Sequence, residues 1–156
     1  MLSDRELYAY KASLSKVKDG DTIVLDINLG FSLSQETEIR LYGVDTPEVY
    51  SVKKDSEEYS FGAKAKSRVV ALLTHNPLYV FTIKDRTGKY GGTYLGEIWF
   101  ETYYEGKEGW HNLSEVLLQE GLAVEYHGKK KKSWPERKAI QEANRLAWEQ
   151  RADKDE

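Results

Sequence analysis

The residues best suited to chemistry lie in one short stretch, Arg40 to Glu48, which reads Arg-Leu-Tyr-Gly-Val-Asp-Thr-Pro-Glu. It combines a guanidinium with the carboxylates of Asp45 and Glu48, and Pro47 makes a rigid corner at the end of an expected strand. Carboxylates hold hard cations or activate water, whereas a guanidinium binds phosphate oxygens. The stretch therefore favours phosphate chemistry, and a surface ion pair at the end of a strand is the alternative.

A second acidic segment, Asp19-Gly20-Asp21-Thr22, precedes this stretch. If the strand that begins at Asp21 pairs antiparallel with the strand that ends at Asp45, the two carboxylates converge. With backbone carbonyls and water they suit Ca²⁺ better than Zn²⁺, because no thiolate and no histidine pair is nearby. We interpret Asp19 as a turn former rather than as a group that supports the site.

Together, the two segments resemble the staphylococcal-nuclease-like (thermonuclease) family, whose hallmarks are Asp-Gly-Asp-Thr followed by Arg-Leu-x-x-Val-Asp-Thr-Pro-Glu. The resemblance covers essentially the whole chain. It implies that Asp21, Asp45 and the carbonyl of Thr46 hold Ca²⁺, that Glu48 is the general base, and that Arg40 binds the scissile phosphate. We expect Arg40 and Glu48 at an exposed corner, where their loss costs little stability.

The resemblance also implies substrate-binding residues. Lys89 and Tyr90 match positions that the family uses near the terminal phosphate and the nucleotide, and Tyr126 matches, less closely, a tyrosine that stacks on the base. Aromatic platforms beside a basic groove bind single strands with little sequence preference. The expected partners are DNA and RNA, with single strands favoured.

The chain departs from the family pattern at one point. The family's second arginine has no match, because Gly92 stands in its place and Thr93 is an extra residue before the next strand. Arg86 lies upstream in the same loop and is a candidate replacement. An enzyme of this kind that lacks the second guanidinium is expected to turn over slowly.

Composition excludes several classes of protein. The 156 residues contain no cysteine, so neither a disulfide framework nor a thiolate metal site is possible, and no stretch approaches the roughly 20 apolar residues of a membrane helix. The net charge of −3 is unusual for a nucleic-acid binder, and we interpret the run from Lys129 to Lys132 as a solvated loop.

No signal peptide is visible, so we expect a cytoplasmic protein or a mature secreted form. We also expect the protein to be a monomer.

Periodicity predicts the elements that position these residues. Alternating apolar residues indicate five strands, and 3.6-residue patterns indicate three helices. The strands are Tyr8–Val17, Asp21–Leu29, Glu36–Val44, Leu78–Ile83 and Tyr94–Phe100; the helices are Gly62–Thr74, Asn112–Gly121 and one that opens at Ser133. We expect an apolar stripe on the last helix from Ile140, Ala143 and Ala147, or from Leu146 and Trp148.

This order predicts an α+β protein, an OB-fold five-stranded antiparallel β-barrel with three α-helices. We expect one nuclease-like domain over residues 1–150 and a frayed tail over residues 151–156.

The leading functional hypothesis is a Ca²⁺-dependent phosphodiesterase (endonuclease) that hydrolyses DNA and RNA at the 5′ P–O bond and leaves 3′-phosphates. The main alternative is a weak or inactive nuclease-like OB module that binds nucleic acid or a protein partner, and a structural OB-type interaction module is a third reading. A histidine-based nuclease is disfavoured, because His75, His111 and His127 lie in separate elements.

Overall fold

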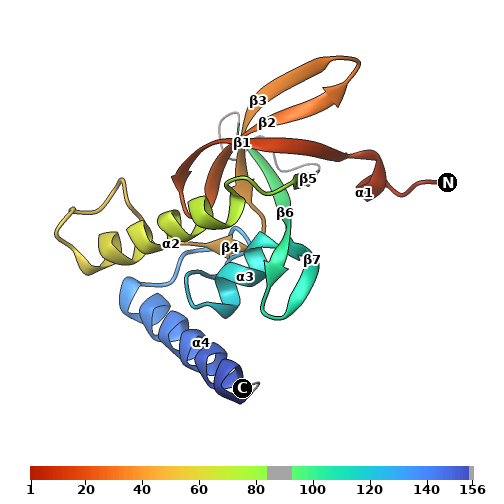
Figure 1. Ribbon diagram of the computed structural model, residues 1–156. Helices are drawn as coiled ribbons and strands as arrows, with labels where there is room; N and C mark the ends of the chain where they lie inside the picture. The colour runs from red at the N-terminus through yellow and green to blue at the C-terminus, as the bar shows by residue number, and fades with distance from the viewer. Residues whose placement is uncertain (84–92, 155–156) are drawn as a thin grey trace.

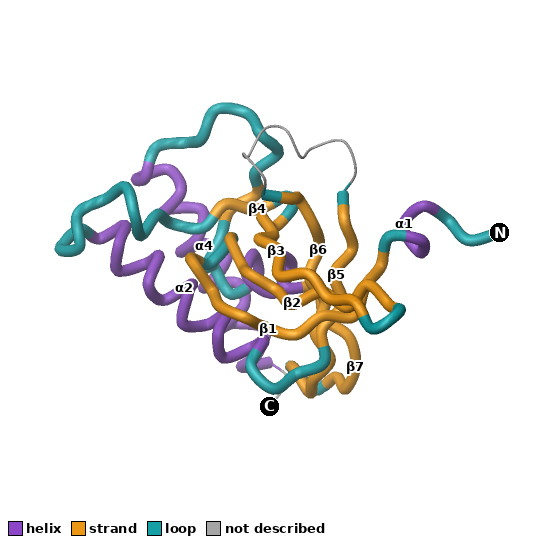
Figure 2. The backbone as a smooth tube through the Cα atoms, turned by 90° about the horizontal axis from the view of Figure 1, so that it is seen from above, coloured by secondary structure: helices purple, strands orange, loops and turns teal. Residues whose placement is uncertain are grey.

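The protein is built around a closed β-barrel (Figure 1). A computed structural model describes residues 1–83 and 93–154. Five strands form the barrel: β1 (Ala9–Asp19), β2 (Thr22–Gly30), β3 (Leu33–Leu41), β5 (Leu78–Thr82) and β6 (Tyr94–Tyr104). They are hydrogen-bonded in the order β3-β2-β1-β5-β6, and β6 then pairs with β3 to close the ring. Seen from above, the strands lie together, with the longer helices to one side of them and the short N-terminal helix to the other (Figure 2).

The predicted α+β class and five-stranded OB-like barrel are confirmed, with one difference in the pairing. The first three strands form the expected antiparallel meander, and β5 pairs antiparallel with both β1 and β6. The closing pair differs, because β3 and β6 run parallel. The barrel is therefore mixed rather than wholly antiparallel.

Strand β2 shows how the alternating sequence produces a half-buried strand. Ile23, Leu25 and Ile27 point into the barrel and are buried, as their spacing predicts. Leu29 is exposed, because the hairpin of β2 and β3 projects beyond the barrel at this point. The alternation of buried residues therefore ends before Leu29.

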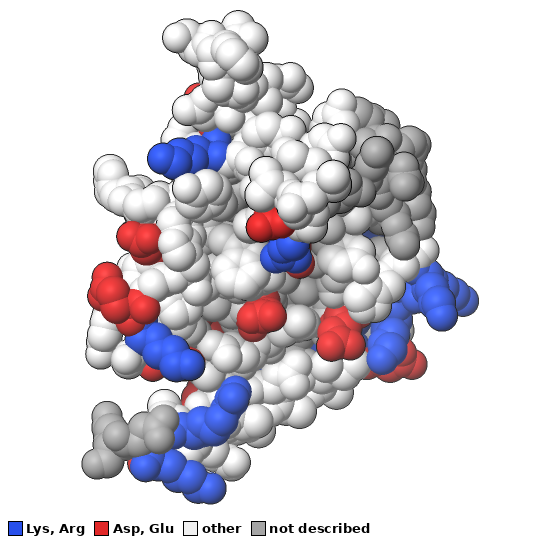
Figure 3. Space-filling model, turned by 90° about the vertical axis from the view of Figure 1, so that its right-hand side faces the viewer, with Lys and Arg blue, Asp and Glu red and all other residues white. Residues whose placement is uncertain are grey.

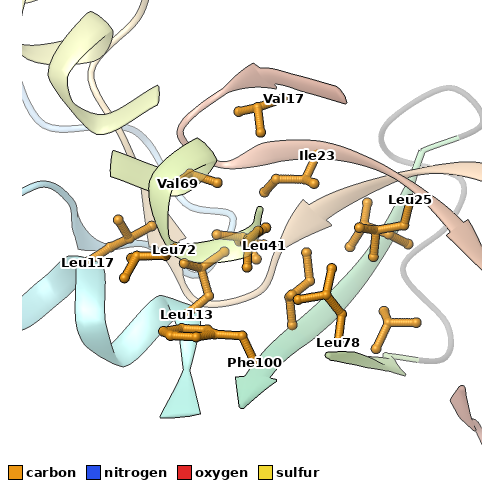
Figure 4. Close-up of a cluster of buried hydrophobic side chains, with 14 of the residues drawn as sticks. Val17, Ile23, Leu25, Leu41, Val69, Leu72, Leu78, Phe100, Leu113 and Leu117 are labelled. Atoms are coloured by element: carbon orange, nitrogen blue, oxygen red, sulfur yellow. The ribbon is translucent and has the colours of Figure 1, made fainter. Parts of the chain in front are cut away.

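One hydrophobic core fills the barrel and continues beneath it. Figure 4 shows side chains of the barrel strands pointing toward residues of two helices, α2 (Glu57–Leu73) and α3 (Leu113–Gln119). Phe100 is completely buried in this cluster, whereas its neighbour Trp99 is partly exposed, as expected for adjacent residues of a strand. The core labelled in the figure comprises Val17, Ile23, Leu25, Leu41, Val69, Leu72, Leu78, Phe100, Leu113 and Leu117.

Both helix starts are fixed by side-chain caps. Helix α2 begins at Glu57, five residues before the predicted start, because the Ser56 hydroxyl accepts a hydrogen bond from the backbone N–H of Tyr59. Helix α3 begins after Asn112, the first residue of the predicted helix. The side-chain oxygen of Asn112 caps the helix and accepts hydrogen bonds from the N–H groups of Ser114 and Glu115.

Four short elements were not predicted. Strand β7 (Lys107–Asn112) forms a hairpin with β6 through Glu105-Gly106, two residues with positive φ. Helix α1 (Asp4–Leu7) precedes the barrel. The two-residue strands β4 (Val44–Asp45) and β8 (Val124–Glu125) pair antiparallel with each other. This last pair brings the middle and the end of the chain together.

The apolar stripe predicted for the last helix, α4 (Trp134–Lys154), is only partly present, because Ile140 and Trp148 are half-buried and the fully buried residues are polar. Ala143, Leu146 and Ala147 are exposed, whereas Arg137 and Gln141 are buried. Figure 1 places α4 at the end of the molecule opposite the β2–β3 hairpin, where β8 and α3 border it. The helix extends past residue 150, and residues 155–156 lie outside the described part of the chain. Among the described residues, no helix is long and apolar enough to cross a membrane.

Gly121 offers a test of how α4 is attached. Its carbonyl accepts a hydrogen bond of 3.0 Å from the Gln141 side chain, and a Cβ at Gly121 would lie 2.2 Å from the backbone oxygen of Gln141. At Gly106, φ is similarly positive, but no atom lies within 4 Å of the same position. Alanine costs on the order of 1 kcal/mol at either site through φ alone. In urea unfolding we expect Gly121→Ala to lower the free energy of unfolding by about 2 kcal/mol more than Gly106→Ala does. The reason is that only a Cβ at Gly121 would collide with α4. Equal losses would show that α4 is not anchored here.

Candidate active site

Arg40 lies near the end of β3, and its guanidinium is enclosed by acceptors. Nη1 donates to the backbone oxygen of Val44 at 2.9 Å and lies 3.1 Å from Asp21 Oδ2, while Nη2 lies 3.4 Å from Asp45 Oδ1. Arg40 as a whole is only 9% exposed. The expectation that it occupies an exposed corner is therefore wrong, and its removal leaves two buried carboxylates without this partner.

The two aspartates approach the same guanidinium from different turns. Asp21 follows the β1–β2 turn, where its N–H is bound by Asp19 Oδ1 at 3.1 Å, so Asp19 acts as a turn former. Asp21 Oδ2 accepts the backbone N–H of Thr46 at 2.9 Å. This bond ties the β1–β2 turn to the segment that carries Asp45.

Two glycines allow the surrounding elements to approach this corner. A Cβ at Gly62 would lie 2.6 Å from the carbonyl oxygen of Pro47, and one at Gly20 would lie 2.8 Å from the Thr46 side chain. Neither distance is tolerated by an ordinary side chain, so both glycines are required for close packing. Helix α2 and the β1–β2 turn thus clamp Thr46 and Pro47 from two sides.

The β4–β8 pair brings the end of the chain over the site. Asp45 pairs with Val124, and the N–H of Tyr126 donates to the Gly43 carbonyl at 2.9 Å. The following loop delivers Lys131, whose Nζ lies 2.9 Å from Asp45 Oδ1 and 2.9 Å from Glu48 Oε1. The interpretation of the lysine run as a merely solvated loop is therefore wrong for Lys131.

Arg137, in the first turns of α4, completes the ion pairs. Its Nη2 donates to Glu58 Oε1 at 2.7 Å, its Nε donates to the Lys132 carbonyl at 3.1 Å, and its Nη1 lies 3.5 Å from Asp45 Oδ2. Arg137 is 7% exposed. Asp45 is therefore shared by cations from β3, the β8–α4 loop and α4.

Burial and these charges act on the acids in opposite directions. Burial raises the pKa of Asp21 to about 6, although Arg40 opposes the shift. Burial also raises the pKa of Asp45, against the effect of Lys131. Partial burial lowers the pKa of Lys131, but its hydrogen bonds to Glu48 and Asp45 outweigh this effect and raise the pKa above its usual range. The cluster thus stabilises Lys131 as a cation.

The site has oxygen atoms that suit a hard cation. Asp45 Oδ2 and Thr46 Oγ1 are buried and form no hydrogen bond with any described residue. In the described part of the chain no three acidic or histidine side chains are arranged around a common metal position. A cation here would therefore take its remaining ligands from backbone carbonyls and water, which Ca²⁺ accepts.

The expected substrate-binding residues are only partly visible. Tyr126 is partly buried, and Lys131 Nζ lies 5.8 Å from the centre of its ring. Lys89, Tyr90, Gly92 and Arg86 lie outside the described residues. His127 packs edge-on against Tyr42.

Comparison with known proteins identifies the relationship. The family model described as staphylococcal nuclease homologue matches residues 38–153. This chain belongs to the staphylococcal nuclease family. A thermonuclease from Staphylococcus intermedius is 31% identical over 110 residues, which cover 70% of this chain and 56% of that nuclease. The chain thus spans little more than half the length of this curated relative.

The nuclease-family match confirms the resemblance in the sequence, but two residues of the site had been missed. Lys131 is one of four consecutive lysines, and nothing in the run distinguishes it from its neighbours. Arg137 lies in a helix for which an apolar inner face was expected. The position of Lys131 becomes clear only in the structure, where the lysine run follows β8, the strand that pairs with β4.

Replacing Arg137 should reveal its structural contribution. Arg137→Ala leaves the part-buried Glu58 without its cation and removes one of the three cations around Asp45, so we expect the free energy of unfolding to fall by about 3 kcal/mol or more. Lys138→Ala is a matched control, because its ion pairs with Glu57 at 2.9 Å and Glu142 at 3.9 Å lie at the surface, and their loss should cost less than about 1 kcal/mol. Urea denaturation measures both changes. Similar small losses would show that Arg137 does not stabilise the buried carboxylates.

Proposed function

We propose that this protein is a Ca²⁺-dependent phosphodiesterase that cleaves DNA and RNA at the 5′ P–O bond. Nuclease-like function follows from the family; the metal, the bond cleaved and the activity of this chain are the proposal. The observation that carries it is the convergence of Asp21 and Asp45 on Arg40, with Glu48 on the adjoining corner. This arrangement combines a hard-cation site, a phosphate-binding group and a base in one place.

In this proposal Asp21, Asp45 and the Thr46 carbonyl would hold Ca²⁺, which would supply positive charge to offset that of the phosphate. Glu48 accepts a proton from a water molecule whose oxygen forms a bond to phosphorus. The bond from phosphorus to O5′ breaks, its electron pair remains on O5′, and O5′ then gains a proton. The products are a 3′-phosphate and a 5′-hydroxyl. Arg40 offsets the negative charge that develops on the phosphate oxygens.

Substrate binding must be local rather than a consequence of overall charge. The net charge is −3, and on the face shown in Figure 3 acidic and basic side chains are interspersed. We propose that Lys89, Tyr90 and Tyr126 bind the substrate and that single strands are preferred, since aromatic rings stack on unpaired bases. We propose a monomer as the active form.

The alternative function is a nuclease-like module that binds nucleic acid or a protein but cuts weakly or not at all. The absence of a second arginine at Gly92 favours it. The presence of Asp21, Asp45, Glu48 and Arg40 in one cluster favours the enzyme.

Metal dependence separates these functions. We expect cleavage of a fluorescent oligonucleotide in Ca²⁺ that stops in excess EDTA. We also expect Asp21→Asn and Asp45→Asn to weaken Ca²⁺ binding in calorimetry by at least about tenfold, since each removes a charged ligand. Asparagine keeps the size of the side chain, and Asp26→Asn, at an exposed position of β2, is the control. Cleavage that persists in EDTA, or Ca²⁺ binding that survives in both variants, would contradict the proposal.

A further inference from the structure

In the described part of the chain, three cations pair with the acidic cluster of Asp21, Asp45 and Glu48. They differ in solvent exposure. The side chains of Arg40 and Arg137 are 10% and 9% exposed, whereas that of Lys131 is 41% exposed. Arg40 Nη1 already serves Asp21 and the carbonyls of Leu41 and Val44. Lys131 is therefore the cation that an incoming anion reaches most easily.

Lys131 also has hydrogen-bonding capacity left. An ammonium group has three N–H donors, and the described partners, Asp45 Oδ1 and Glu48 Oε1, account for two. One donor remains for another acceptor. Because the acceptors of one ammonium group are neighbours, an oxygen bound to this donor lies next to Glu48.

The fold fixes Lys131 at this place. The β4–β8 pair sets the start of its loop against Asp45, and the loop ends where Arg137 binds the Lys132 carbonyl. Both ends of the loop are therefore attached to the cluster. Lys129, Lys130 and Lys132 are exposed in the same run.

We propose that Lys131 is a phosphate-binding residue of the catalytic site, which holds a non-bridging oxygen of the scissile phosphate beside Glu48. This inference rests on the proposed function and adds a residue to it. Lys131 transfers no proton; it neutralises charge on the phosphate as the attacking oxygen adds. Lys131 would have to compete with a cation bound at Asp45 for that carboxylate, and would then be left to Glu48 and the phosphate.

Substitution in the lysine run tests this role. We expect Lys131→Ala to lower kcat on a single-stranded oligonucleotide in saturating Ca²⁺ by about 100-fold or more, as removal of a transition-state donor does elsewhere. Lys131→Arg should retain more activity than Lys131→Ala, because it keeps the charge. Lys130→Ala is the matched control, and its kcat should stay within about twofold of the parent, as for a surface charge.

Calcium affinity distinguishes this role from that of a mere counter-ion. We expect Lys131→Ala to bind Ca²⁺ more tightly in calorimetry, since a competing cation has left Asp45. If Lys131 binds the phosphate, the Lys131→Ala variant binds Ca²⁺ more tightly and cleaves more slowly than the parent. Tighter binding with unchanged or faster cleavage would overturn the proposal, because Lys131 would then only occupy the metal site.

An inactive parent would overturn the proposed function but would still test Lys131. The affinity for a nuclease-resistant phosphorothioate oligonucleotide in Ca²⁺ is then the measurement. A loss of several-fold in Lys131→Ala, relative to Lys130→Ala, would support the phosphate contact. Equal affinities of the two variants would exclude it.

Discussion

The buried carboxylate of Asp45 is the interaction on which this site depends. It has almost no exposure, and it meets Arg40 from β3, Lys131 from the β8–α4 loop and Arg137 from α4. A lone charge in such a place would be neutralised by protonation, so its ionised form requires these partners. In return, one side chain connects the barrel, the loop and the last helix. The stability of the fold and the metal binding proposed for Asp45 therefore depend on the same atoms, and we expect few substitutions at this position to affect only one of them.

The barrel itself contributes a rigid frame rather than the whole site. Strands β2 and β3 place Asp21 and Arg40, and the clamp of Gly20 and Gly62 fixes the corner after Asp45. Two of the three cations that balance the acids, Lys131 and Arg137, come from outside the barrel and follow a pair of strands only two residues long. In this protein the acidic residues thus belong to the barrel motif, whereas Lys131 and Arg137 belong to the C-terminal segment.

The strands of the barrel and the acidic motif can be predicted from the sequence, because each is encoded by residues that are close together in the chain. Alternation in Ile23, Leu25 and Ile27 gives β2 directly, and the corner at Pro47 is encoded by its own residues. Lys131 could not be found in this way, because its partners lie more than 80 positions earlier in the chain and all four lysines look alike. The inner face of α4 was missed for a related reason. Its buried Gln141 binds a backbone carbonyl, and hydrophobic periodicity does not register polar contacts of that kind.

The order in which the chain is made has a consequence for the cluster. A ribosome releases the barrel, with Asp21, Arg40 and Asp45, before it releases the residues around Lys131 and the helix that carries Arg137. Among the described residues made by then, Arg40 is the cation paired with the two aspartates, so their two negative charges are not fully balanced. Final charge balance, and with it the mature site, is reached only when the first turns of α4 have folded back against β8. Docking of α4 therefore completes the charge balance around Asp45.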